Sequence, residues 1–186
     1  MNGLPIADIP PVALPCPSAD RLSTLFDAHY ERLYRLARRL VPTTDAARDL
    51  VQDTFLKAAR AIASIPIGRA GEEAWLVRVL VNLRRDEWRK TVVRRRHLDE
   101  AKHSTRVRTD QEAVFVAQAT VWHALDRLTP RRRAVLVMHE LEGLTIPAIA
   151  SLLGITAITV RWHLSKGRGE MARVLRSHGG EDHGKR

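Results

Sequence analysis

The sequence lacks any long run of apolar residues, and this absence excludes several classes of protein. No hydrophobic stretch approaches the roughly 20 residues that a bilayer-spanning helix needs. The first twenty residues also lack a charged start followed by an apolar segment, which argues against a secretory signal. The single cysteine, Cys16, cannot form an internal disulfide, which suits a reducing compartment. We therefore expect a cytoplasmic protein without membrane insertion.

Acidic residues are also scarce relative to basic ones. The chain has 31 Lys and Arg against 21 Asp and Glu, a formal net charge of +10. Residues 78–108 hold eleven of the basic and four of the acidic residues, a local excess of +7. Such a block attracts phosphate backbones and gives a salt-dependent affinity for nucleic acid. The alternative is a solvated helix face without a partner.

Proline is concentrated at one end of the chain. Five of the nine prolines lie in the first nineteen residues: Pro5, Pro10, Pro11, Pro15 and Pro17. A helix does not tolerate this density of proline. The composition therefore predicts a disordered or extended leader over residues 1–19.

The rest of the chain shows helical periodicity and no convincing strand. Apolar residues recur at steps of three and four from about Asp20 to Val41, and Pro42 ends this predicted helix. Thr44 is the expected cap of a second helix. Pro66 and Gly68 interrupt the helical pattern, and a third helix is predicted from about residue 72 to residue 96.

The helices divide into two groups, so the fold class is all-α, with two small helical domains joined by a flexible linker. The first domain spans 20–96, and the polar residues 97–110 form the predicted linker. The second domain spans 111–176 and is followed by a polar tail, 177–186. In it, Thr129 and Pro130 predict a helix start, and Gly143 marks the end of that helix. We expect no metal ion there, because no rigid element would hold His178, Asp182 and His183 of the tail in ligand geometry.

Residues 141–168 predict two short helices around a tight turn. Thr145 caps the first helix, Gly154 supplies the turn and Thr156 caps the second helix. Small and apolar residues at these spacings favour a DNA-binding helix-turn-helix over an ordinary helical hairpin. Gly167 and Gly169 are poor helix-interior residues, so the helix either frays there or lets its backbone approach DNA. Several polar or large side chains of the second helix are free to contact DNA: Thr159, Arg161, Trp162, Ser165, Lys166 and Arg168.

The second predicted helix of the first domain carries an acidic face. Asp49 and Asp53 lie one turn apart beside Gln52. Neutralisation by Arg48 and Lys57 is the simpler interpretation. The functional interpretation is a docking face for a basic partner.

Three segments, in this order, resemble bacterial sigma factors of the extracytoplasmic function (ECF) type. They are "DAARDLVQDTFLKAAR", "AWLVRVLVNLRRDEWRKTVVRRR" and the segment from "ALDRLTPRRRAVL" to "VRWHLSKGR", and the resemblance covers roughly residues 20–175. It implies a transcription initiation factor, not an enzyme, whose partners are core RNA polymerase and promoter DNA. It also implies control by an anti-sigma factor.

The resemblance implies roles for individual residues. The polymerase-docking motif corresponds to Asp49, Gln52, Asp53 and Phe55, although Phe55 also suits the core. The −10 promoter element would be met by Arg69, Arg78, Asn82, Arg85 and Arg89, with Asp86 orienting an arginine. The loop 62–71 corresponds to the segment that captures a flipped base. Trp75 suits either base stacking or, more simply, the core.

The sequence departs from the family pattern in its second domain. Ala148, preceded by Pro147, stands where a glutamate is common, and Trp162 is bulkier than expected on the reading face. We therefore expect an unusual promoter preference. The main alternative is a stand-alone helix-turn-helix regulator that uses the same reading helices without polymerase. A metal-dependent hydrolase using His29, His139 and Glu140 is disfavoured, because no HExxH or paired His–carboxylate spacing is present.

Overall fold

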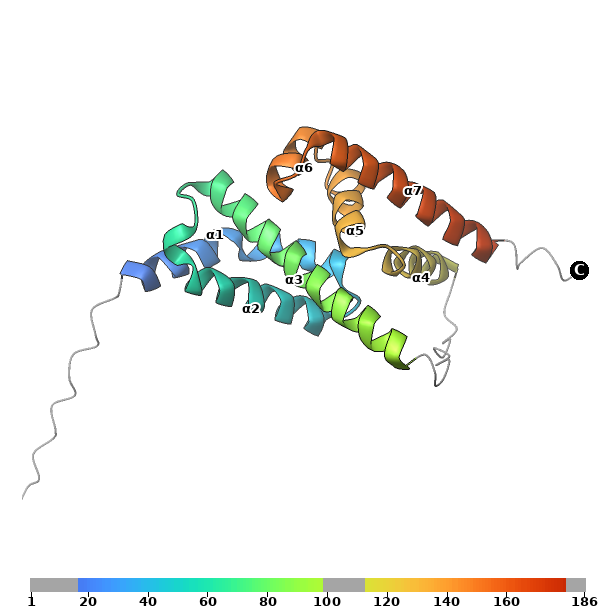
Figure 1. Cartoon of the computed structure of the whole chain (residues 1–186), viewed down its shortest axis with the longest axis horizontal. Coiled ribbons are helices and arrows are strands. Elements are labelled where there is room, and N and C mark those ends of the chain that lie inside the picture. Colours follow the sequence, from blue (N-terminus) through green and yellow to red (C-terminus); the bar gives the residue numbers. More distant parts are fainter. Residues whose placement is uncertain (1–16, 99–112, 180–186) are drawn as a thin grey trace, which may run out of the picture.

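The computed structural model describes residues 17–98 and 113–179, and within these ranges the elements are helices (Figure 1). The predicted leader, linker and tail fall mainly outside them. The first group of helices comprises α1 (Pro17–Leu40), α2 (Thr44–Arg60), the short 3₁₀ turn η1 (Ile62–Ser64) and α3 (Arg69–Leu98). The second comprises α4 (Ala113–Asp126), α5 (Pro130–Leu136), the π-helical turn η2 (Val137–Leu141), α6 (Ile146–Leu153) and α7 (Ala157–Gly179).

Several helix ends differ from the sequence predictions by a few residues. Helix α1 already starts at Pro17, since a proline is tolerated in the first turn. The side chain that caps α2 belongs to Thr43 instead of Thr44, and it accepts a hydrogen bond from the backbone N–H of Ala46. Helix α3 starts at Arg69, before the predicted position, and the tail's first residues continue α7 to Gly179.

The first three α-helices bury one face each against the others. Leu33, Leu36 and Ala37 of α1 are fully buried, as are Leu76, Val77 and Leu80 of α3. Helix α2 contributes buried residues at helical spacing, Ala47, Leu50, Val51, Thr54, Phe55 and Ala58. Trp75 is half-buried and packs against this core, as the simpler interpretation of the sequence predicted.

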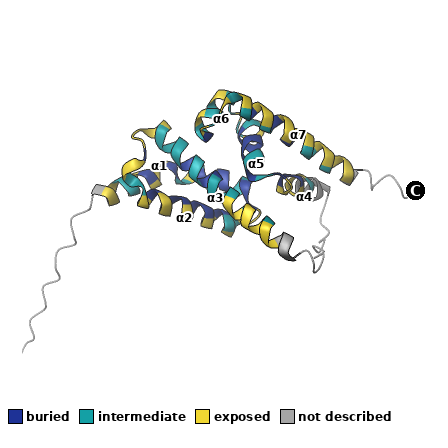
Figure 2. Ribbon diagram, in the orientation of Figure 1, coloured by how far each residue is buried: buried dark blue, intermediate teal, exposed yellow. Residues whose placement is uncertain are grey.

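The two groups of helices pack against each other, a contact about which the predicted two-domain organisation said nothing. Helix α3 contacts both α5 and α6, and α1 contacts α5. One hydrophobic cluster includes Leu36 of α1, Val77 of α3, Met138 of η2 and Ile149 of α6. Burial is accordingly continuous between the groups where α5 meets α3 (Figure 2). Periodicity identifies an apolar stripe but not its partner, so this packing could not be predicted.

A polar cluster joins α1 to the second group. Glu142, directly after η2, forms ion pairs with Arg32 at 2.7 Å and with Arg39 at 3.0 Å. Burial lowers the pKa of Arg32, but hydrogen bonds and charge from Glu142 and Glu73 outweigh it and raise the pKa overall. The buried Arg133 of α5 donates to the carbonyl of Arg39 at 2.7 Å and pairs with Asp126. These contacts hold the two groups in a closed arrangement.

Candidate polymerase and nucleic-acid interfaces

The acidic face predicted on α2 is exposed. Asp49, Gln52 and Asp53 are all exposed, whereas Phe55 is 7% exposed and belongs to the core. Arg48, which the simpler interpretation paired with this face, instead contacts Asp45 at 3.5 Å. The exposed carboxylates of Asp49 and Asp53 are therefore available to a basic partner.

The sequence did not reveal a third member of this acidic face, Glu87 of α3. Burial raises the pKa of Glu87; Arg84 and Lys90 lower it, whereas Asp53 and Asp49 raise it. The charges of Asp53 and Asp49 both act on Glu87, so its carboxylate lies on the side of α3 that faces them, where it also pairs with Arg84 at 3.8 Å. Because Glu87 comes from another helix, no spacing in the sequence connects it with them.

The predicted −10 residues lie along α3 in different environments. Arg69 and Arg89 are exposed, whereas Arg78, Asn82 and Arg85 are half-buried. Arg85 donates to Asp86 at 3.3 Å, so Asp86 orients an arginine as predicted.

Arg78 is occupied by other parts of the chain. Its Nε donates to the carbonyl of Ala74 at 3.1 Å. Its side chain also approaches the turn of the second group, where a Cβ added at Gly154 would lie 3.1 Å from the Cδ of Arg78. In the closed arrangement, therefore, Arg78 packs against the turn before α7.

A basic residue of the second group, Arg131, lies beside the basic residues of α3. The pKa of Arg131 on α5 is lowered by burial and then by the charges of Arg85 and Arg89. Arg131 is thus close to the basic face of α3. The sequence alone does not connect Arg131 with a site, because its neighbours on α3 are far away in the chain.

Helices α6 and α7 form the predicted helix-turn-helix. The Thr145 hydroxyl caps α6, and Gly154 has a left-handed backbone with φ +63° that makes the turn. The Thr156 hydroxyl accepts from the N–H of Thr159 at 3.2 Å at the start of α7. Val160 and Leu164 are buried and fix the orientation of α7.

The predicted reading residues of α7 are exposed, apart from Thr159, and they differ in their partners. Arg161, Ser165 and Lys166 are exposed, and Thr159 is half-buried and bonded to Thr156. Trp162 is 48% exposed, and the guanidinium of Arg132 stands 5.2 Å from its ring centroid. Arg168 donates twice to Glu140, at 2.9 and 2.6 Å.

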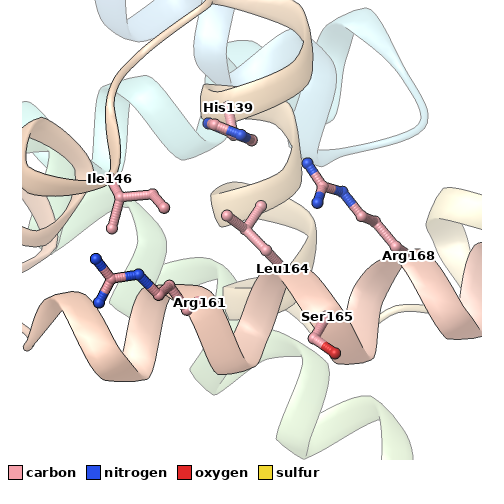
Figure 3. A pocket seen from close by; sticks show the side chains of 6 residues that line it. All are labelled: His139, Ile146, Arg161, Leu164, Ser165 and Arg168. Carbon is pink, nitrogen blue, oxygen red and sulfur yellow. The ribbon is translucent and has the colours of Figure 1, made fainter.

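A cavity of about 350 Å³ lies beside this face, and the side chains that line it are shown in Figure 3. Arg161 and Arg168 flank it from α7, with Ser165 between them in the sequence. His139 and Ile146 line it from η2 and α6; Nδ1 of His139 lies 2.9 Å from the carbonyl of Leu144. The guanidinium groups of Arg161 and Arg168 suit an anionic group such as a phosphate, which would replace Glu140 as the partner of Arg168.

The residues of the disfavoured hydrolase interpretation have separate contacts. His29 lies 3.3 Å from Glu72, whereas His139 and Glu140 contact Leu144 and Arg168 as described above. Among residues 17–98 and 113–179 no group of three His, Cys, Asp or Glu could hold a metal ion. In the same ranges, no single helix is long and apolar enough to cross a membrane; a bent pair, α6 with α7, meets the criterion by length and composition only.

Comparisons with known proteins agree with this geometry. The model of the Sigma-70 region 2 family matches residues 25–96, and that of Sigma-70, region 4 matches residues 118–171. The ECF RNA polymerase sigma factor SigM of Mycobacterium tuberculosis is 32% identical over 151 residues, which are 81% of this chain and 75% of that protein. SigE of Mycolicibacterium smegmatis is 31% identical over 173 residues; the match covers 82% of this chain but only 61% of the relative.

Two solved structures have a similar fold. The sigma factor RpoE, solved with the anti-sigma factor NepR from Bartonella quintana, gives a TM-score of 0.60 at 23% identity; the match covers 84% of this chain and 97% of that one. CnrH, solved with the cytosolic domain of CnrY, gives 0.54 at 25% identity, with 86% and 95% covered. Taken with the two family models and the identity to SigM, the chain belongs to the ECF family of RNA polymerase sigma factors.

Proposed function

We propose that the chain is a transcription initiation factor that binds core RNA polymerase and directs it to promoters with defined −10 and −35 elements. The observation that carries this proposal is the exposed acidic face of α2 in a chain with a formal net charge of +10. A regulator that only binds duplex DNA has no use for carboxylates in this position, since they repel phosphates. A basic protein partner accounts for them.

The work is divided between the two groups of helices. Asp49, Gln52 and Asp53 bind polymerase, and Phe55 supports them from the core beneath. Promoter DNA at the −10 element is met by α3, through Arg69, Arg78, Asn82, Arg85 and Arg89. The −35 element is read by α7, through Thr159, Arg161, Trp162, Ser165, Lys166 and Arg168.

The chemistry of transcription belongs to the polymerase in this proposal, so the chain needs no cofactor and is not itself an enzyme. Strand opening uses the energy of binding bases outside the stack. The chain acts in the cytoplasm. The two similar structures were solved with NepR and with CnrY, which supports an anti-sigma factor as a further partner of this chain.

The test compares two double variants that change the net charge equally. Asp49→Ala with Asp53→Ala removes the acidic face, whereas Asp27→Ala with Glu31→Ala removes two exposed carboxylates of α1 outside it. We expect the first pair to weaken binding to purified core polymerase at least tenfold and to abolish run-off transcription. The second pair should bind like the unchanged protein, and both should keep its melting temperature.

Equal affinities of both pairs would remove Asp49 and Asp53 from the docking face. If the unchanged protein neither binds core polymerase nor directs initiation, the proposal fails. Tight duplex binding without polymerase would then favour the stand-alone regulator.

A further inference from the structure

An apolar groove of about 400 Å³ runs between α1 and α2 beside the acidic face. Its lining combines aromatic and aliphatic side chains with two polar ones. The residues are Leu22, Phe26, Tyr30, Arg48, Val51, Gln52, Phe55, Leu56 and Ala59. The groove is open to solvent, since Phe26 is 42% and Leu56 47% exposed. Solvent-exposed aromatic and leucine side chains gathered in one hollow mark a binding surface.

The aromatic side chains give this groove a specific shape. The rings of Phe26 and Tyr30 are stacked with centroids 4.8 Å apart, and Phe55 lies 4.8 Å from Phe26 in a tilted arrangement. Aromatic-lined grooves of this kind bind proline-rich segments in the polyproline II conformation, because the preformed helix loses little entropy on binding. The groove therefore favours an extended, proline-rich ligand over an amphipathic helix.

The chain itself contains a segment with this composition. Residues 1–16, which lie outside the described part of the chain, hold four prolines and the aliphatic residues Leu4, Ile6, Ile9, Val12 and Leu14. Asp8 is the only charged side chain among them, whereas 28% of all residues are charged. Segments that stay solvated normally have low hydrophobicity and high net charge, so this composition indicates a binding segment.

The position and length of this segment fit the groove. It joins α1 at Pro17, five residues before Leu22 at one end of the groove. The groove follows α1 from Leu22 to Tyr30, about 12 Å of helix. Sixteen residues in the polyproline II conformation span about 50 Å, enough to reverse direction and cover that length. Arg48 in the groove is 64% exposed, so the carboxylate of Asp8 can compete with Asp45, which lies 3.5 Å from it, for this guanidinium group.

We propose that residues 1–16 bind in the groove between α1 and α2 of the same chain and cover the polymerase-docking face. Their aliphatic side chains and prolines pack on Phe26, Tyr30 and Leu56, and Asp8 pairs with Arg48. Gln52 both lines the groove and belongs to the docking face, so a bound leader and polymerase compete for it. This competition rests on the proposed function, but the contact between leader and groove does not.

The contact can be tested in the full-length protein by photo-cross-linking. Benzoylphenylalanine replaces Leu56 in the groove or, as a matched control, Ile67, which is 92% exposed and does not line the groove. Arg21 is the first basic residue, so trypsin releases the leader within peptide 1–21, while position 56 falls in peptide 49–57. Cleavage at the single cysteine, Cys16, then separates residues 1–15 from the start of α1.

We expect position 56 to cross-link to residues 1–15 within one chain, and position 67 to give no such product. Replacing Ile9, Val12 and Leu14 together by serine should reduce the product at least fivefold. Equal cross-linking from both positions, no leader product from position 56, or a product joining two chains would overturn the proposal. The last result would make a second copy the occupant.

Polymerase binding tests the regulatory consequence separately. If the leader occupies the groove nine-tenths of the time, the triple serine variant should bind core polymerase about tenfold more tightly than the unchanged protein. An unchanged affinity alongside a confirmed cross-link would refute the competition. If neither protein binds polymerase, the proposed function fails while the cross-link still decides the leader contact.

Discussion

Two glycines of α7, Gly167 and Gly169, should differ in how their replacement by alanine changes the stability of the folded protein. Gly167 is buried, and a Cβ added to it would lie 2.4 Å from Cδ1 and 3.4 Å from Cγ of Leu136 on α5. Gly169 is exposed, and a Cβ there would meet nothing within 4 Å. Both residues lie inside a continuous helix from Ala157 to Gly179. The helix therefore does not fray at either glycine, and Gly167 permits the close approach of α5.

Both substitutions gain the same helix propensity, but they differ in the packing of the new methyl group. Replacing a helix-interior glycine by alanine stabilises a helix by about 1 kcal/mol. At Gly169 nothing opposes this gain, so Gly169→Ala should stabilise the protein by about that amount. At Gly167 the new methyl group forces the buried Leu136 to move, and overpacking of this kind costs about 1–3 kcal/mol. Gly167→Ala should therefore be neutral or destabilising by up to about 2 kcal/mol.

Thermal and urea unfolding of both variants measure this difference. For a chain of this size, 1 kcal/mol corresponds to a change in Tm of about 2–4 °C. We expect the Tm of Gly169→Ala to rise and that of Gly167→Ala to stay level or fall. Equal stabilisation by both substitutions would refute the close packing of α5 on α7. A fall in both would indicate that Gly169 also has a contact.

Four further substitutions test the reading helix and the closed arrangement. Arg161→Ala and Lys166→Ala should each weaken −35 recognition by about 1–3 kcal/mol if they contact bases; unchanged −35 footprints would show that the reading face is misassigned. Glu142→Gln removes the charge that pairs with two arginines of α1, so the two groups of helices should separate more readily. Small-angle X-ray scattering should then record a larger radius of gyration; an unchanged radius would show that these ion pairs do not hold the two groups together. Burial and then Arg131 and Arg132 lower the pKa of His163, so the folded state resists its protonation and stability should fall as the pH drops below about 6.5. His163→Gln should lose less Tm than the unchanged protein between pH 7.5 and 5.5, and an equal loss would contradict this.

The sequence predicted local structure well and contacts between distant segments poorly. Thr145, Gly154 and Thr156 act as the cap, turn and cap that their residue types favour, because these roles depend on neighbouring backbone groups. The surroundings of Glu87 and Arg131 could not be predicted, because the residues near them belong to helices far away in the chain. The packing of α5 and α6 on α3 was missed for the same reason, since an apolar stripe does not identify what covers it.

The exposure of individual side chains could be predicted from the sequence, but their contacts with other elements could not. Exposure of Asp49 and Asp53 followed from their place opposite the buried stripe of α2. The contact of Arg168 with Glu140, and that of Arg132 with Trp162, join residues of different elements and could not be predicted. These two contacts orient residues of the proposed reading face before DNA is present. The bulk of Trp162 thus has a structural explanation, because its ring rests against a guanidinium that Glu170 holds at 2.6 Å.

The closed arrangement has a consequence for promoter recognition. Elements at −10 and −35 lie about 25 base pairs apart, or roughly 85 Å along B-form DNA. Helix α3, which carries the proposed −10 face, has 30 residues and is about 45 Å long. The turn that precedes the reading helix contacts this same helix, with Gly154 packed against Arg78. If these are the two DNA-binding faces, as proposed above, the closed arrangement places them too close together to reach both elements at once, and we expect the groups of helices to separate on the promoter. Such a separation would break the ion pairs that Glu142 forms with Arg32 and Arg39 and would free Arg78 from the turn at Gly154. We therefore expect the contacts that close the free protein to oppose promoter binding until a partner holds the two groups apart.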